Sequence, residues 1–277
     1  ILMRLNREVG YPTVDQFTAH PPPRTRFNHS LSARRNFTTR QIPLAEVKAV
    51  GRKLGGTVND VVLALSAGAV RNYLLFHDDL PDEPLHISVP VSADDVDTTR
   101  ESGNRTSYFP TRLWTNKADP VARFHAIKQS TDVGKRELEA MGKSTFVEMM
   151  HFLPPAFTIW KANRKQRLRL ADRPDYKPQT NMIVSNVPGP GEKQTGNYGT
   201  LEDLYSMGPL VEGCGLNITA WSYAGNLNVS IMSCKKAIPD LDRLADGLLD
   251  ALAELQGVPT AEEQKVSDAL AQEGTGG

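Results

Sequence analysis

A short polar pair closes an apolar run in the stretch 182–190, which reads Met-Ile-Val-Ser-Asn-Val-Pro-Gly-Pro. Proline has no amide hydrogen to give a strand ladder and glycine turns the chain easily, so the run predicts a buried strand that ends at Val187. Ser185 and Asn186 then lie at the mouth of the strand, and strand ends in open α/β sheets often line a ligand crevice. The alternative is a plain strand end with a locally bonded asparagine.

A second polar pair begins a helix. Thr57 suits the N-cap position, and Asn59 and Asp60 fall in the first turn of a helix that the periodicity extends to about residue 75. Amide hydrogens are unpaired there and the helix dipole is positive, so the Asp60 carboxylate is stabilised whatever else it does. Two compatible interpretations remain. In one, Asn59 and Asp60 are residues that start the helix. In the other, Asn59 faces a ligand while Asp60 holds its loop by hydrogen bonds.

Composition excludes several classes of function. The 277 residues are 39% hydrophobic and 23% charged, and 32 Lys and Arg balance 32 Asp and Glu. The balance argues against nucleic acid as the main partner. The sequence contains neither an apolar run long enough to cross a bilayer nor a visible signal peptide. Cys214 and Cys234 lack close Cys or His partners, so we expect no metal site, reduced structural thiols and a cytoplasmic location.

Helical and strand patterns interleave along the chain, which predicts an α/β two-layer sandwich with a mixed sheet. The Pro-rich residues 1–30 are expected to be a linker, and the polar residues 257–277 a disordered tail. Helices are expected at 43–54, 57–75, 119–141, from Thr145, from Pro155 to about 170, and at 241–255. Strands are expected at 31–41, 85–91, 104–114, 182–187, near 204–207, and in a hairpin of 214–222 with 227–233, where a two-residue loop at Ala224 and Gly225 would pair Tyr223 with Asn226.

Three motifs in this order resemble the C-terminal half of the bacterial wax ester synthase/diacylglycerol acyltransferase family. They are Thr-Val-Asn-Asp-Val-Val-Leu-Ala at 57–64, Ser-Asn-Val-Pro-Gly-Pro at 185–190, and Gly-Pro-Leu with Gly-Leu-Asn-Ile-Thr and Ser-Tyr-Ala-Gly-Asn-Leu at 208–227. The likeness covers roughly residues 25–256. It implies one CoA-dependent acyltransferase-like half with a chloramphenicol acetyltransferase-like fold, occupying residues 31–256 after a separate N-terminal domain.

The resemblance implies transfer of a fatty acyl group from acyl-CoA to diacylglycerol or to a fatty alcohol, with acyl-CoA as co-substrate and no further cofactor. In the family, the second histidine of a His-His-x-x-x-Asp-Gly motif is the general base. None of the six histidines here stands in such a motif. The catalytic histidine is therefore expected on the preceding N-terminal domain of the same gene product, and this chain is expected to supply hydrogen-bond donors.

For the site, the resemblance implies that Asn59, Asp60, Ser185 and Asn186 bind substrate or line the tunnel. Where the family tends to place a basic residue after the strand 89–92, this chain has Ala-Asp-Asp at 93–95, so no phosphate contact is expected there. Asn104 is expected to be a turn residue, and contact with substrate is the second interpretation. Asn217 and Thr219 alternate with apolar residues, and the expected location of their shared face is the solvent.

Apolar side chains cluster around Pro154 and Pro155, and a basic run at 161–169 follows them. This pattern suits docking on a membrane or lipid-droplet surface, and equally a core helix with a solvated basic end. Contact between the basic run and CoA phosphates is a third interpretation. At the level of function, the rival to the acyltransferase is a non-catalytic lipid-binding or scaffolding module. A peptide-synthetase condensation domain fits the motifs at 59–60 and 185–190 poorly.

Overall fold

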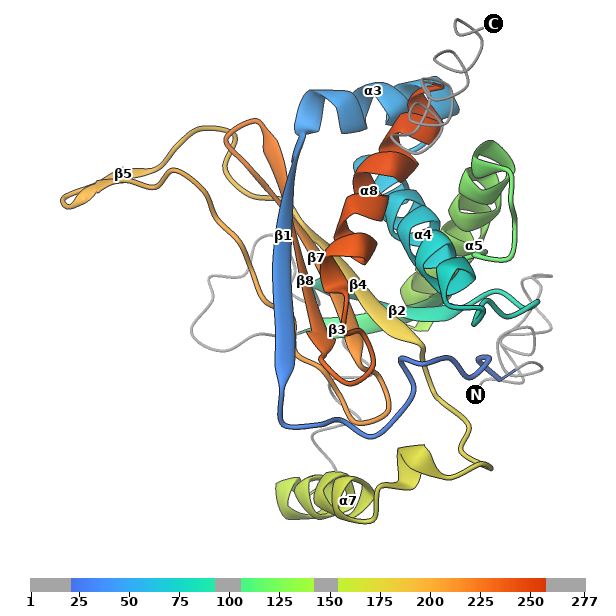
Figure 1. Cartoon of the computed structure of the whole chain (residues 1–277). Helices are drawn as coiled ribbons and strands as arrows, with labels where there is room; N and C mark the ends of the chain where they lie inside the picture. The colour runs from blue at the N-terminus through green and yellow to red at the C-terminus, as the bar shows by residue number, and fades with distance from the viewer. Residues whose placement is uncertain (1–20, 93–105, 142–153, 258–277) are drawn as a thin grey trace, which may run out of the picture.

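The computed structural model describes residues 21–92, 106–141 and 154–257 (Figure 1). Its centre is a mixed six-stranded sheet in the order β1-β8-β7-β4-β2-β3. The two central contacts, β7 with β4 and β4 with β2, are parallel, and the remaining pairs are antiparallel. The strands are β1 Arg35–Pro43, β2 His86–Ser92, β3 Thr106–Arg112, β4 Met182–Val187, β7 Leu216–Tyr223 and β8 Asn226–Cys234.

Four helices form a layer over one face of the sheet (Figure 1): α3 Leu44–Leu54, α4 Val58–Phe76, α5 Pro120–Met141 and α8 Leu241–Gln256. This arrangement confirms the two-layer sandwich with a mixed sheet. The helix α7 Pro155–Arg167 and the short helix η1 Leu170–Asp172 lie apart from that layer. An arm made of β5 Thr195–Gly196 and β6 Gly199–Thr200 extends away from the body.

The helix α4 occupies the middle of the helical layer. Its small residues allow α8 to approach closely: a Cβ added to Gly68 would lie 2.6 Å from the Cβ of Ala251, and one added to Gly247 of α8 would lie 3.1 Å from the Cα of Ala69. Thirteen residues of α4 are buried, as its low charge content predicts. Apolar burial of this kind provides the main free energy that holds the helices against the sheet.

The hairpin of β7 and β8 follows the predicted register, with Tyr223 opposite Asn226. Ala224 and Gly225 form the two-residue turn at φ 46° and 85°, which is the left-handed geometry that tight hairpins favour. Cys214 and Cys234 at the other end of the hairpin are free and buried.

Two sequence-based expectations about the far face of the sheet are wrong. Residues 204–207 form no strand: the carbonyl of Leu204 instead accepts a hydrogen bond from the Asn228 side chain at 3.0 Å. Asn217 and Thr219 are 2% and 4% exposed rather than solvated. The segment around Gly208 covers them, because the Pro209 carbonyl accepts a hydrogen bond from Asn217 Nδ2 at 3.1 Å. Thr219 in turn donates to Asn217 Oδ1 at 2.9 Å.

Part of the stretch expected to be a linker belongs to the packed body. Phe27 and Asn28 are fully buried, and Asn28 Nδ2 donates to the carbonyl of Gly213 at 2.9 Å. Its side-chain oxygen accepts from Asn181 Nδ2 at 2.8 Å. These contacts join residues that are far apart in the sequence, which is why composition alone assigned them to a linker. Residues 1–20, the helix expected from Thr145, Asn104, the stretch 93–95 and the tail 258–277 lie outside the described residues.

Candidate functional site

A cavity of about 450 Å³ lies where the parallel strands β2 and β4 end and where α4 begins. The C-terminal ends of neighbouring parallel strands meet at one edge of a sheet, so this is the place where α/β proteins commonly bind ligands. Its walls combine apolar side chains with a few polar ones. The lining residues are Asn59, Val89, Pro90, Val91, Phe109, Lys135, Ser185, Asn186, Val187 and Pro188.

The turn after β4 fixes the position of Ser185 and Asn186. β4 ends at Val187, as predicted, and the backbone then passes over the β7–β8 hairpin. The amide of Gly189 donates to Ser222 Oγ at 3.1 Å, and the amide of Ala224 donates to the Pro190 carbonyl at 3.0 Å. A Cβ on Gly189 would lie 2.3 Å from the Ser222 carbonyl oxygen. Only glycine therefore allows this close approach.

The start of α4 separates the roles of Asn59 and Asp60. Thr57 and Asp60 form a reciprocal capping box: the Thr57 amide and hydroxyl donate to Asp60 Oδ2, each at 2.8 Å, and Thr57 Oγ1 accepts from the Asp60 amide at 3.3 Å. Asp60 is 1% exposed and does not line the cavity. Asn59 does line it. The structure therefore brings Asn59, Ser185 and Asn186 together and places Asp60 behind them as a support.

These three side chains are available to a ligand. Within the part of the chain that the structure describes, none of them is engaged in a hydrogen bond. All three are half-buried, so water competes less for their amide and hydroxyl groups than it does at an open surface. A serine hydroxyl and two carboxamides can both donate and accept hydrogen bonds. The group suits recognition of a carbonyl, an ester or an alcohol.

Lys135 is a site residue that sequence reasoning missed. It lies on α5, and it reaches the cavity because α5 packs tightly on β3: a Cβ on the adjacent Gly134 would lie 2.8 Å from the Phe109 ring. Among the described residues it has no ion-pair partner, whereas Lys128 on the same helix pairs with Asp132 at 2.8 Å. An unpaired cation beside polar donors suits an anionic group on a ligand. Only the packing of α5 against the sheet reveals this position.

The described lining of the cavity supplies hydrogen-bond donors and a cation. The described residues that line it include no histidine and no carboxylate. The described residues also contain no group of three or more His, Cys, Asp or Glu side chains placed to hold a metal ion. None of the described helices combines the length and hydropathy needed to traverse a bilayer. By itself the arrangement can bind and polarise a carbonyl-containing ligand.

Comparison with solved structures finds the same fold in two proteins of different sequence similarity. The solved epimerization domain of tyrocidine synthetase B superimposes with a TM-score of 0.56 over 92% of this chain and 56% of that one, at 14% identity, which shows a shared fold alone. The wax ester synthase/diacylglycerol acyltransferase from Marinobacter aquaeolei VT8 superimposes with a TM-score of 0.67 at 28% identity, over 86% of this chain and 53% of that one.

Sequence comparison then gives the family. The model of the WS/DGAT C-terminal domain matches residues 102–256, and the model of the wax ester synthase/diacylglycerol acyltransferase catalytic domain matches residues 5–62. The chain therefore belongs to the wax ester synthase/diacylglycerol acyltransferase family. Asn59 falls in the second match and Ser185 and Asn186 fall in the first, so the cavity joins residues matched by both models.

Curated relatives are about twice as long as this chain. A putative diacylglycerol O-acyltransferase of Mycobacterium tuberculosis is 36% identical over 91% of this chain and 48% of its own length. The O-acyltransferase WSD of Acinetobacter baylyi is 29% identical over 90% of this chain and 52% of its own length. The chain thus spans about half the length of the curated relatives that it matches.

Proposed function

We propose that this chain is the C-terminal part of an acyl-CoA-dependent O-acyltransferase that makes triacylglycerol or wax ester. The observation that carries the proposal is the cavity, where Asn59, Ser185 and Asn186 come together from two distant motifs and their side chains have no hydrogen-bond partner among the described residues. The family membership and the names of the relatives supply the reaction class. The acceptor is diacylglycerol or a fatty alcohol, and the cavity does not discriminate between them.

In this proposal the acceptor hydroxyl attacks the thioester carbonyl of acyl-CoA. A histidine on the preceding N-terminal domain takes the hydroxyl proton, and the tetrahedral oxyanion collapses to the ester while the CoA thiolate leaves. The carboxamides and the hydroxyl in the cavity are placed to donate hydrogen bonds to the substrate carbonyl or to the oxyanion. Such a donor is worth about 3–4 kcal/mol of barrier when it is well aligned.

The β5–β6 arm supports a second lobe as partner. All residues from 191 to 203 are exposed, and Tyr198 at the tip is fully exposed, so the arm buries almost nothing against this chain. Tyr223 nevertheless fixes its base: the Tyr223 hydroxyl accepts from the Gln194 amide at 2.8 Å and donates to the Leu201 carbonyl at 2.7 Å. An extended arm on a fixed base is suited to reach a neighbouring domain.

The test uses the full-length gene product and measures transfer of a labelled fatty acyl group from acyl-CoA to diacylglycerol and to a fatty alcohol. Asn186→Ala is expected to lower kcat by about a hundredfold, because a preorganised donor is lost. Asn116→Ala is the matched control, since Asn116 makes an exposed hydrogen bond to the Asp82 carbonyl and does not line the cavity. If Asn186→Ala and Asn116→Ala have the same activity, the cavity takes no part in acyl transfer. An inactive wild-type protein that still binds lipid would favour the scaffolding module.

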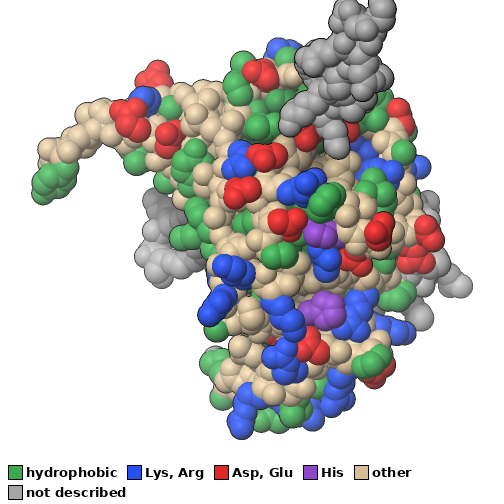
Figure 2. Space-filling view, in the orientation of Figure 1, with side chains coloured by type: hydrophobic (Ala, Val, Ile, Leu, Met, Phe, Trp, Pro, Cys, Tyr) green, Lys and Arg blue, Asp and Glu red, His purple; other side chains and the backbone are tan. Residues whose placement is uncertain are grey.

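We further propose that α7 docks this protein on a lipid surface, the source of its acceptor. Phe157, Ile159 and Trp160 are 49%, 59% and 58% exposed, and the rings of Phe157 and Trp160 stack with centroids 6.0 Å apart. Figure 2 shows Lys and Arg side chains gathered at the same end of the molecule. The basic residues of α7 and its C-terminal side are Lys161, Arg164, Lys165, Arg167 and Arg169. Apolar anchors beside cations are typical of interfacial helices.

Sedimentation with vesicles of phosphatidylcholine and phosphatidylglycerol tests this docking. Phe157→Ser with Trp160→Ser is expected to weaken vesicle binding at least tenfold, since burying one such ring contributes roughly 1.5–3 kcal/mol. Phe76→Ser is the control, because Phe76 is an exposed aromatic residue on α4 at 55% exposure. If the control weakens binding as much as the double variant, or if neither does, α7 is not the lipid-binding surface.

A further inference from the structure

A second cavity lies away from the candidate site, below the open end of the β7–β8 hairpin. It measures about 230 Å³ and is enclosed by the segment 26–30, the start of β7 and the loop that follows β8. Its lining residues are Arg26, Phe27, His29, Ser30, Gly215, Cys234, Lys236 and Ala237. The cavity thus combines a thiol, a hydroxyl and three basic side chains, and the proposed acyl transfer uses none of them.

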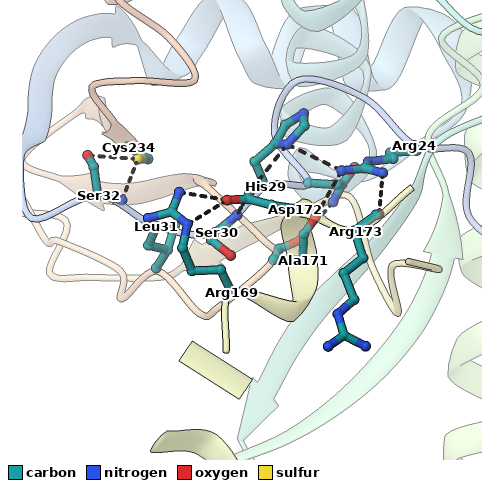
Figure 3. A network of polar contacts seen from close by, with 12 residues as sticks. Arg24, His29, Ser30, Leu31, Ser32, Arg169, Ala171, Asp172, Arg173 and Cys234 are labelled. Atoms are coloured by element: carbon teal, nitrogen blue, oxygen red, sulfur yellow. Dashed lines mark hydrogen bonds and ion pairs between the residues drawn. The ribbon is translucent and has the colours of Figure 1, made fainter. Parts of the chain in front are cut away.

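The sulfur of Cys234 is held as a hydrogen-bond acceptor (Figure 3). The Ser32 amide donates to Sγ at 3.3 Å, and the Ser32 hydroxyl lies 3.3 Å from the same atom. Burial alone would raise the pKa of the Cys234 thiol, but the Ser32 hydroxyl and amide, with the amides of Lys236 and Ala237, outweigh burial and lower it. Such donors favour the thiolate, which is the nucleophilic form of cysteine.

Cys214 provides an internal contrast. It is also 2% exposed, but burial dominates there and raises its pKa to about 12. Its sulfur faces carbonyl oxygens, those of Asn181 at 3.7 Å and Leu216 at 3.9 Å. Carbonyls accept a proton and repel a thiolate, so Cys214 is expected to be a weak nucleophile although it also lines a pocket. The two cysteines of this chain therefore differ in environment although they are equally buried.

Ser30 is an independent sign that the cavity takes a ligand. It is 3% exposed and lines the cavity, and its hydroxyl has no hydrogen-bond partner within the described part of the chain. A buried hydroxyl left unpaired costs about 1–3 kcal/mol. A ligand that accepts a hydrogen bond from it would remove this cost. Cys234 shares the same cavity, and because it is itself almost fully buried, only a molecule small enough to enter reaches its sulfur.

The charges around the cavity favour an anion. Asp79 faces Arg26 at 3.5 Å, and Asp172 is held by Arg169 at 2.6 Å while it also accepts the Ser30 amide at 2.8 Å (Figure 3). Both carboxylates are therefore already paired. Lys236 lies exposed at the rim without an ion-pair partner among the described residues. His29 also lines the cavity, and its Nδ1 lies 3.6 Å from the Asp172 carboxylate and 3.3 Å from the Arg24 guanidinium.

We propose that this cavity is a thiol-modification site, in which Cys234 forms a mixed disulfide with a small, negatively charged disulfide. The Cys234 thiolate attacks one sulfur of the disulfide, a new S–S bond forms, and the original S–S bond breaks. The second half of the reagent leaves as a thiolate with the electron pair. Lys236 attracts the anionic group, and the Ser30 hydroxyl donates a hydrogen bond to it. The modified sulfur would occupy the cavity between residues 26–30 and the hairpin.

The experiment compares two small disulfides on the folded chain: dithiodiglycolate, which carries two carboxylates, and neutral hydroxyethyl disulfide. Modification of each cysteine is followed by peptide mass spectrometry, and the urea-unfolded chain supplies the intrinsic rate ratio of the two reagents. In the folded chain Cys234 is expected to react well ahead of Cys214. Its preference for the anionic reagent should exceed the unfolded ratio about fivefold, the effect of one nearby positive charge in a watery site.

Three variants test which residues determine the reagent preference and the reactivity of Cys234. Lys236→Gln should remove most of the anionic preference, whereas Lys235→Gln, the same charge change at the adjacent exposed residue outside the cavity, should retain it. Ser32→Ala should slow both reagents at Cys234. The proposal is overturned if Cys234 reacts only as fast as Cys214, because both then require unfolding. It is equally overturned if folded and unfolded chains show the same reagent ratio.

Discussion

Asn59 and Asp60 are adjacent residues in different surroundings. Asp60 is buried and accepts hydrogen bonds from Thr57, whereas Asn59 lines the cavity and its carboxamide has no hydrogen-bond partner in the described part of the chain. The sequence predicted a role at the helix start because a threonine at the N-cap and an acid in the first turn are local signals. Lys135 had no such signal, because its place depends on how α5 packs against β3. Local chemistry was thus predictable, and the cation that completes the cavity was not.

Stability and turnover should therefore respond to different residues at this helix start. Thr57→Ala is expected to lower the free energy of unfolding by about 1 kcal/mol, the usual cost of losing an N-cap. Asn59→Ala should leave that free energy nearly unchanged and reduce acyl transfer in the full-length protein. Urea unfolding of each variant, set beside its kcat, provides the measurement. A loss of stability in Asn59→Ala as large as in Thr57→Ala would make Asn59 a structural residue as well.

Asn217 shows that the alternation of polar and apolar residues along a strand does not predict whether a face of the strand is exposed. The pattern correctly placed Asn217 and Thr219 on one face of a strand, but it could not say what covers that face. A segment near Gly208 does so, close enough that a Cβ on Gly208 would lie 2.3 Å from the Asn217 carboxamide. The residues of the motif at 208–219 therefore contact one another within the fold, whereas the motif at 185–190 supplies residues that line the cavity.

At the scale of elements, regular sequence patterns predicted the observed strands correctly, and irregular patterns did not. β4 has the predicted bounds and the β7–β8 hairpin has the predicted turn, because Pro, Gly and alternation act locally. The segment 204–207 looked like a strand but forms none, and its Leu204 carbonyl accepts a side-chain hydrogen bond from Asn228. The sheet order around β4 was not predictable, since it depends on contacts between residues far apart in the sequence.

The turn after β4 is an element whose geometry can be tested by one methyl group. Gly189→Ala is expected to destabilise the protein by about 1–3 kcal/mol, because the added Cβ would overlap the Ser222 carbonyl oxygen and the Trp221 ring. Gly191→Ala, two residues on, meets no atom within 4 Å and should change the free energy of unfolding by less than about 0.5 kcal/mol. Chemical denaturation distinguishes the two. If both variants unfold alike, the turn is not docked on the hairpin as described.

At the scale of the whole molecule, the chain is a well-packed sandwich with a candidate ligand cavity at one edge of its sheet. The described residues that line the cavity offer donors and a cation and include no histidine, the β5–β6 arm reaches outward, and the curated relatives are about twice as long. The sequence predicted the sandwich because helical and strand periods alternate. It could not predict that residues 25–30 complete the body, since Asn28 bonds to Gly213 and Asn181 across the fold.

The account depends on this lobe supplying one wall of an acyl-transfer tunnel whose proton acceptor stands on another lobe. Acyl transfer from labelled acyl-CoA to diacylglycerol and to a fatty alcohol, assayed with the folded 277-residue chain and with the full-length gene product, tests this most directly. The expected result is ester formed by the full-length protein and none above background by the chain alone. Ester formed at a comparable rate by the chain alone would contradict the account.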